Sequence, residues 1–175
     1  MINWTQFENR LLQYVKSQQA KNEDDFAQRL VEEYDTAIKT GTNQYFERPF
    51  QVNKNAFVNA IKSGFRVARL TKNANQAQTA IKTMFAIGVI SYWTGGTLAL
   101  TPFPPGSISV VTNIVTFPGN PPVLLVGNTS NVESMVRLMS AQLKTHSITV
   151  AGITTALVNV GGTPIPTPFL WTGIK

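Results

Sequence analysis

The chain has 175 residues, of which 43% are hydrophobic and only 14% charged, and its formal net charge is +6. A domain of this length can bury a core, but so few charges leave much of a monomer's surface uncovered, which favours burial against a partner. The absence of cysteine excludes disulfides and thiolate metal sites, and the single histidine, His146, argues against a histidine-based metal site within one chain.

A membrane location is not expected. The most apolar window, residues 84–100, contains Ser91, Thr94, Gly95, Gly96 and Thr97 and falls short of the ~20 apolar residues that a spanning helix needs. The first residues, MINWTQFENR, lack the basic and apolar regions of a signal peptide, so we expect none.

The charges and the prolines divide the chain into two parts. Of 24 charged residues (15 basic and 9 acidic), only Glu133, Arg137, Lys144 and Lys175 follow residue 90, whereas nine of the ten prolines follow Leu100. We therefore predict a helical domain over residues 1–96 and a proline-rich part over residues 97–175, together forming one compact unit.

The first part is predicted to be an antiparallel bundle of four amphipathic helices joined by short connections. Asparagine side chains mark the helix starts, because they accept hydrogen bonds from free N–H groups of the first turn. The helices are expected to run from Asn3 through Val15, from Asn22 to a C-cap at Gly41, from Asn53 to Leu70 after a turn around Pro49, and from Ala74 to Tyr92 before Gly95 and Gly96.

The second part is predicted to mix strands with one helix. Residues 107–117 are rich in β-branched side chains and, after a turn at residues 118–122, residues 123–126 pair back as a short β-hairpin. A capping box at Ser130 and Glu133 starts a fifth helix, whose apolar spacing favours one long helix ending near Asn159; the alternative is a strand from Ile148. Gly161 and Gly162 then release an extended C-terminal arm, TPIPTPFLWTGIK. The fold class is thus α-rich α+β.

No enzyme chemistry is expected. His146 has only Glu133 as an acidic residue in its half of the chain, more than three helical turns away, so no catalytic triad can be assembled. We interpret His146 as a surface or interface histidine, and the acidic runs at residues 23–25 and 32–35 as helix-start and solvated charges. We predict no catalytic residue, no metal site and no cofactor.

The aromatic residues of the charge-poor part have two interpretations. They cap a small core, or they face another subunit, since extended proline-rich segments usually lie in a groove or add to a neighbour's sheet. We favour the second interpretation, because tyrosine and tryptophan bury large areas at interfaces. The predicted partner-interface residues are Tyr92, Trp93, Phe103, Phe117, Phe169, Leu170 and Trp171.

The basic residues also have two interpretations. Seven basic and no acidic residues lie between Arg48 and Lys82, and Lys62, Arg66 and Arg69 recur at helical spacing. One interpretation is a solvated outer face. The other is that these three residues and Lys72 form a surface that contacts nucleic-acid phosphates without reading the bases.

Four segments resemble small structural proteins of tailed bacteriophage virions, of the neck, tail-completion or head–tail type. They are WTQFENRL at residues 4–11, EEYDTAIKTG at residues 32–41, SYWTGG at residues 91–96 before the prolines, and PFLWTG at residues 168–173. The resemblance implies a virion component, made in the host cytoplasm, that assembles as a homo-oligomeric ring or symmetric lattice. Its partners would be portal, tail or capsid proteins, with possible non-specific contact to the DNA backbone.

Two alternatives to a neck or tail protein stay open. A capsid decoration or cement protein would bind assembled capsids rather than a portal or tail. A small basic nucleic-acid-binding protein would lose affinity steeply with salt and when Lys62, Arg66 and Arg69 become alanine.

Overall fold

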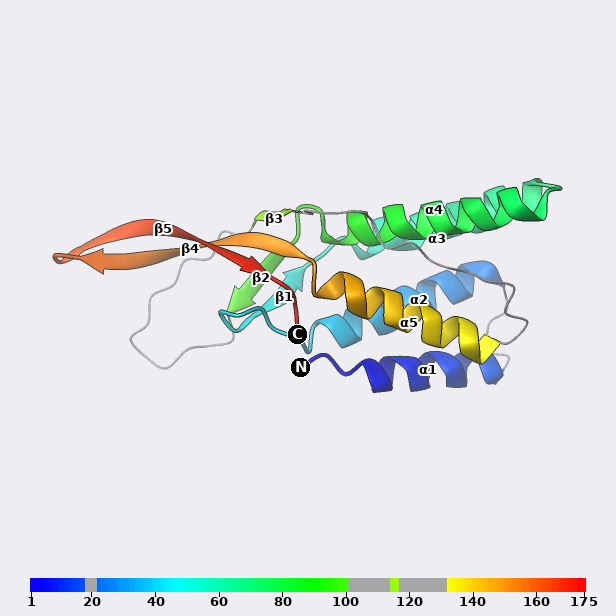
Figure 1. Ribbon diagram of the computed structural model, residues 1–175, viewed down its shortest axis with the longest axis horizontal. Coiled ribbons are helices and arrows are strands. Elements are labelled where there is room, and N and C mark those ends of the chain that lie inside the picture. Colours follow the sequence, from blue (N-terminus) through cyan, green and yellow to red (C-terminus); the bar gives the residue numbers. More distant parts are fainter. Residues whose placement is uncertain (18–21, 101–113, 117–131) are drawn as a thin grey trace.

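The computed structural model describes residues 1–17, 22–100, 114–116 and 132–175, and within them the chain is helix-rich α+β, as expected (Figure 1). The elements follow in the order α1 Trp4–Lys16, α2 Glu23–Ile38, β1 Glu47–Gln51, α3 Lys54–Leu70, α4 Ala74–Trp93, β2 Thr97–Leu100, β3 Ile114–Thr116, α5 Val132–Ser147, β4 Ala151–Val160 and β5 Thr163–Thr172. The helices gather at one end of an elongated molecule, and the β4–β5 hairpin points away from them at the other end.

The predicted asparagine caps are present. Asn3 accepts a hydrogen bond from Gln6 N at 3.0 Å, Asn22 from Asp25 N at 2.9 Å, and Asn53 from Ala56 N at 3.1 Å. Asn73 caps α4 in the same way, by accepting from Gln76 N at 3.3 Å. Each cap satisfies a donor that the first helical turn leaves unpaired, which is why these boundaries could be predicted from sequence.

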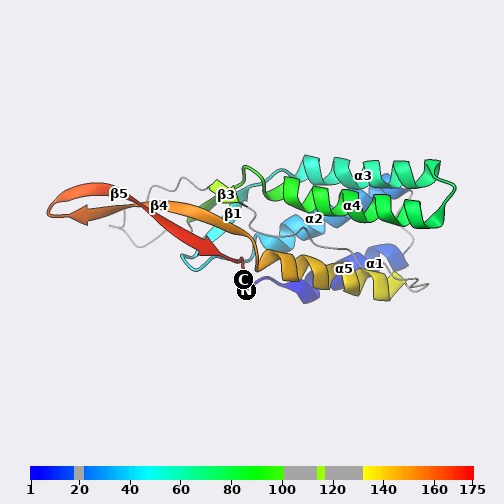
Figure 2. The same cartoon turned by 45° about the horizontal axis from the view of Figure 1, so that its top comes forward.

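Helices α3 and α4 lie side by side along their lengths, and α5 packs against α1 (Figures 1 and 2). Gly88 permits the close approach of α4 to α3, because a Cβ atom there would lie 2.5 Å from the Phe57 ring. Gly41 also permits a close approach between segments, and it does not form the predicted C-cap of a helix. Its φ is not positive, and a Cβ atom would meet Ile2 at 2.4 Å and Ile174 at 2.8 Å.

One hydrophobic cluster draws on both parts of the chain. Phe7, Leu11, Tyr34 and Phe57 come from the first part and pack with buried residues of α5, the strand region and the C-terminus: Val136, Met139, Leu143, Val150, Trp171 and Ile174. The two chain ends lie close together beside this cluster, between the helices and the root of the hairpin (Figures 1 and 2).

The described strands form two antiparallel sheets. β1 pairs with β2, and β4 lies between β3 and β5. The predicted turn around Pro49 is wrong, since Pro49 lies inside β1, opposite Leu98. Because β1 is paired on one side only in its described sheet, a residue without an N–H group is tolerated there.

The predicted long fifth helix is also wrong, and the alternative, a strand, is correct, although the strand begins at Ala151 rather than at Ile148. α5 ends at Ser147, and the chain then forms β4, a segment rich in β-branched residues that favour strands. The predicted free arm is β5, which pairs with β4 over ten residue pairs. Of the hairpin expected over residues 107–126, only β3 is described, and it pairs with β4; the remainder lies outside the described residues.

Candidate interaction surface

The β4–β5 hairpin projects from the helices (Figure 1). Gly161 and Gly162 both have positive φ, 60° and 91°, which suits the tight turn that joins two twisted strands. No charged residue occurs from Ala151 to Ile174. The hairpin therefore consists of apolar and neutral polar residue types, and its paired backbone projects from the helices (Figure 1).

A buried carboxylate holds the base of β4. Glu47 of β1 has no exposed area, and its Oε2 accepts hydrogen bonds from Thr154 Oγ1 at 2.5 Å and from Asn43 Nδ2 at 2.6 Å. Asn43 Oδ1 in turn accepts from the backbone N–H groups of Tyr45 and Glu47. A carboxylate is costly to bury without donors, so this network fixes the hairpin to the β1 end of the body.

The turn before β1 holds the base of β5. The carbonyl of Leu170 accepts hydrogen bonds from Gln44 Nε2 at 3.1 Å and from Tyr45 Oη at 3.0 Å. The Tyr45 and Phe169 rings meet edge to face, with their centroids 6.0 Å apart. Both strands of the hairpin are therefore tied to one short stretch, residues 44–47, β5 through Gln44 and Tyr45 and β4 through Glu47.

The chain end is anchored as well. Trp171 and Ile174 are buried, and the backbone groups of Lys175 and Thr42 exchange two hydrogen bonds of 2.9 Å. Gly173, at a φ of 77°, donates to the carbonyl of Val150 at 2.6 Å. Both strands of the hairpin are thus held at the point where they leave the rest of the molecule.

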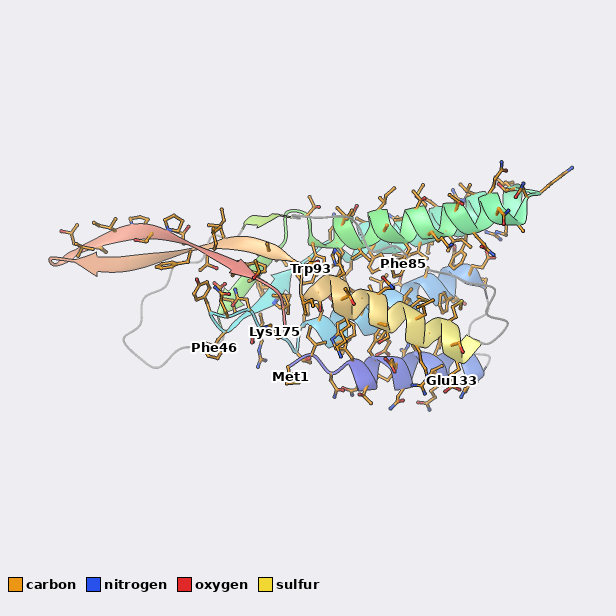
Figure 3. All side chains as sticks on the ribbon, in the orientation of Figure 1. Met1, Phe46, Phe85, Trp93, Glu133 and Lys175 are labelled. Atoms are coloured by element: carbon orange, nitrogen blue, oxygen red, sulfur yellow. The ribbon has the colours of Figure 1, made fainter. Side chains whose placement is uncertain are left out.

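Apolar side chains are exposed on the hairpin and in the loop at its base. Leu170 is 74% exposed, Val160 57% and Ile165 45%, and Phe46, in the loop that holds β5, is 67% exposed. Phe46 also has a φ of 64°, which is unfavourable for a bulky residue and recurs at functional sites. Figure 3 shows Phe46 at the hairpin end of the molecule. These four residues are called the hairpin surface below, although Leu170 lies on one face of the hairpin and Ile165 and Val160 lie on the other.

The structure corrects the predicted interface at three residues. Tyr92, Trp93 and Trp171 are buried within their own chain, so no side-chain surface is left for a partner. Trp93 Nε1 donates to Tyr34 Oη at 3.0 Å, and Tyr92 Oη donates to Asp35 Oδ1 at 2.9 Å. Burial raises the pKa of both the Tyr34 and Tyr92 phenols well above the usual value.

The other predicted interface residues have different outcomes. Leu170 belongs to the hairpin surface, and Phe169 is half-buried against Tyr45. Phe103 and Phe117 lie outside the described residues. Sequence reasoning missed Asn43, Glu47 and Thr154. The contacts between Asn43 and Glu47 are local, but the role of Thr154 depends on a contact with Glu47 across 107 residues, which no local pattern indicates.

Two of the four predicted nucleic-acid-facing residues are engaged with α2. Arg69 Nε lies 3.0 Å from Glu23, and Lys62 Nζ lies 3.7 Å from Asp24. Arg66 and Lys72 are exposed and have no ion pair with the described residues. The acidic first turn of α2 therefore neutralises half of the proposed basic surface.

The interpretation of His146 as a surface or interface histidine is wrong, because the residue is buried within its own chain, in the last turn of α5. Burial lowers its pKa to about 4. Within residues 1–17, 22–100, 114–116 and 132–175, no three acidic or histidine side chains gather as metal ligands. In the same ranges, no helix combines the length and apolar character needed to cross a membrane.

Comparisons with known proteins identify no relative. No protein family matches the chain, and neither the curated proteins nor the solved structures include a significant match.

Proposed function

We propose that the chain is a non-enzymatic structural protein of a tailed-phage virion, which self-associates and docks onto neighbouring virion proteins at the neck or head–tail junction. The single observation that carries the docking role is the uncharged β4–β5 hairpin, which projects from the helical body and is anchored at its base. The assignment to a virion comes from the resemblance of the four sequence segments.

The hairpin suits docking because it is ordered before it meets a partner. A free arm must lose backbone freedom on binding, at roughly 1–2 kcal/mol per residue, whereas the ten pairs of β4 and β5 already hold that backbone. Burying the exposed parts of Leu170, Ile165 and Val160 then stabilises a complex by about 25 cal/mol per Å² of apolar area.

A nucleic-acid-binding role is less well supported. Phosphate binding draws on cationic side chains that are free to neutralise phosphates. The contacts of Lys62 with Asp24 and of Arg69 with Glu23 leave Arg66 and Lys72 as the members of the predicted group that have no ion pair with the described residues. Protein–protein docking through the hairpin surface is therefore the proposal that the geometry favours.

The first test is the protein content of the particle. Mass spectrometry of purified virions should find peptides of this chain at a fixed copy number per particle. Peptides found only in the infected-cell lysate would overturn the virion assignment. Protein found on isolated capsids and missing from neck and tail fractions would instead support a decoration protein.

The second test shortens the hairpin. Residues 155–168 are replaced by an Asn-Gly turn, which keeps the Thr154–Phe169 pair and the anchors below it. Supplied to phage lacking the gene, this variant should fold and fail to enter particles. Leu70→Ala is the matched control, because Leu70 is 81% exposed but lies at the far end of α3. Normal incorporation of the shortened variant would overturn docking through the hairpin.

A further inference from the structure

Helices α3 and α4 form one side of the helical body, and α1 and α5 lie toward the other side in both views (Figures 1 and 2). Gly64 of α3 lies against α4, because a Cβ atom there would be 2.9 Å from the Cβ of Met84. Phe85 marks the side of α4 that faces the body, since its ring is buried (Figure 3). Each of the two helices therefore has one side against the other helix, one against the body, and an outer side.

The outer side of this helix pair carries exposed aliphatic residues. Ile87 follows Phe85 by two residues, so it lies on the opposite side of α4, and it is 45% exposed. Val67 follows Gly64 by about one turn, so it borders α4, and it is 43% exposed. Their own chain thus leaves much of both side chains uncovered. The aliphatic face, as it is called below, consists of Val67 and of three α4 residues at helical spacing, Ala80, Thr83 and Ile87.

The charged residues of α3 and α4 lie on other sides of these helices. Lys62 and Arg69 reach the acidic start of α2. Arg66 and Lys82 lie about 100° or more around their helices from the members of the aliphatic face. A helix at the surface of a monomer normally directs its charged and polar side chains outward. An exposed aliphatic face without charge is instead typical of a surface that binds another protein.

We propose that two copies of this chain pair through the aliphatic face, with α4 antiparallel to α4 of the second copy and α3 antiparallel to α3, as in a four-helix bundle. The proposal rests on the proposed function, because it names the surface through which the chain self-associates. Charge favours a second copy as the occupant. The chain has a net charge of +6, so two copies repel each other through their basic surfaces, and a face without charge is where they can approach.

A single two-fold axis matches the residues of both helices. An axis that passes between Thr83 and Met84 sets Ile87 opposite Ala80 of the second copy. The same axis crosses α3 beside Gly64, because Gly64 lies against Met84, and there it sets Val67 opposite Ala60 of the second copy. Each exposed aliphatic side chain then meets an alanine, and this alternation of large and small residues allows two helix surfaces to interdigitate.

The size of the helix pair fits a specific contact. α4 has 20 residues and α3 has 17, so the two helices are about 25–30 Å long at 1.5 Å per residue, and together they are about 20 Å wide. Contact over this area buries about 1,000–1,200 Å² in total, the low end of the range for specific interfaces. Leu70, near the end of α3, falls opposite the level of buried Phe57 and takes part in neither aliphatic pair.

The first experiment measures mass in solution by light scattering over a range of protein concentrations. The wild type should have twice the mass of the Ile87→Lys variant, because the substitution places like charges in the contact. Gln13→Lys is the matched control: it adds the same charge at an exposed position of α1 and should keep the pair. A wild type that is monomeric at every concentration would overturn the proposal, as would an unchanged mass for a folded Ile87→Lys protein.

Cysteine variants test the position of the axis, since the chain has no cysteine. Thr83→Cys lies beside the axis and should oxidise to a disulfide-linked pair, whereas Gln13→Cys should not. Two equivalent residues at position 80, or at position 87, are separated by about 10 Å along the antiparallel helices, too far for a disulfide. Ala80→Cys and Ile87→Cys should therefore link poorly alone and well when the two proteins are mixed. Equal linking of the single and mixed samples would overturn the antiparallel register.

Failure of this inference can be told apart from failure of the proposed function. If the wild type is monomeric but the shortened hairpin is still excluded from particles, docking holds and pairing through the aliphatic face is wrong. If the wild type is monomeric and Ile87→Lys is excluded from particles, the face contacts a different virion protein and self-pairing is again wrong. If Ile87→Lys dissociates the pair but virions contain no peptides of this chain, the pairing is supported and the virion role is wrong.

Discussion

The hydroxyl of Thr154 donates a hydrogen bond to the buried carboxylate of Glu47 at 2.5 Å, across 107 residues of sequence. This contact joins β4 of the projecting hairpin to β1 of the body. Glu47 has no ion pair with the described residues, and its Oε2 accepts hydrogen bonds from Thr154 and Asn43. The anchoring of the hairpin is therefore coupled to the stability of the body.

Thr154→Val is expected to destabilise the protein by about 1.5–3 kcal/mol, because a charged acceptor loses a buried donor. The corresponding fall in Tm is roughly 3–12 °C for a chain of this size. Thr155→Val is the control, since Thr155 is the half-buried neighbour on the opposite face of β4. Thermal unfolding followed by circular dichroism should separate the two variants; equal Tm values would contradict the anchoring role of Thr154.

Trp93 and Leu170 were both predicted interface residues, and the structure gives them different roles. Trp93→Phe removes the donor to Tyr34 Oη and part of a buried ring, so we expect a loss of about 1–3 kcal/mol of stability. Leu170→Ala should change stability by less than about 0.5 kcal/mol, because that side chain is exposed.

Incorporation into particles also distinguishes the Leu170→Ala variant from the Trp93→Phe variant. Leu170→Ala should lower incorporation into particles while leaving Tm unchanged, whereas Trp93→Phe should incorporate normally at temperatures where it stays folded. Measuring Tm and the copy number per virion on the same preparations gives both quantities. A Leu170→Ala protein that incorporates like the wild type would remove Leu170 from the hairpin surface.

The helices could be predicted from sequence because their signals are local. Asn3, Asn22 and Asn53 each contact the N–H group three residues ahead, and apolar residues recur at the helical period. The end of α5 was missed because residues 148–158 have strand-like composition together with helix-like spacing. This segment is a strand because it pairs with β5, and that pairing cannot be inferred from the neighbouring residues alone.

The candidate surface was only partly predictable, for a related reason. A Tyr-Trp pair near the end of a helix is as typical of a buried core as it is of an interface. Tyr92 and Trp93 are buried because Tyr34 and Asp35, nearly 60 residues earlier, supply the hydrogen-bond partners that make their burial possible. Leu170 stays exposed because alternation along β5 places it on the face opposite Trp171.

His146 should make stability depend on pH. Burial lowers its pKa to about 4, against about 6.5 for an exposed histidine, so the unfolded chain binds the proton more readily between these values. Stability is therefore complete above pH 6.5 and falls as the pH drops toward 4, by up to about 3 kcal/mol.

His146→Gln tests this linkage, because glutamine does not titrate and His146 is the single histidine of the chain. Urea unfolding at intervals between pH 4 and 7 should show a flatter profile for the variant than for the wild type. The comparison is best made above pH 5, where most carboxylates are still ionised. Parallel profiles in that range would show that His146 is not the group responsible.

Phe46 combines an unfavourable backbone conformation with an exposed aromatic ring, and the two properties predict opposite effects of one substitution. Phe46→Gly should leave stability unchanged or raise it by up to about 1 kcal/mol, because glycine accepts a φ of 64° without strain. The same variant should enter particles less well, because the hairpin surface loses its aromatic member. Phe50→Gly is the matched control: Phe50 is also exposed but lies in β1, where glycine should cost about 1 kcal/mol. A large loss of stability in Phe46→Gly would mean that the ring supports the fold, and the strained turn at residues 43–46 would then need no functional explanation.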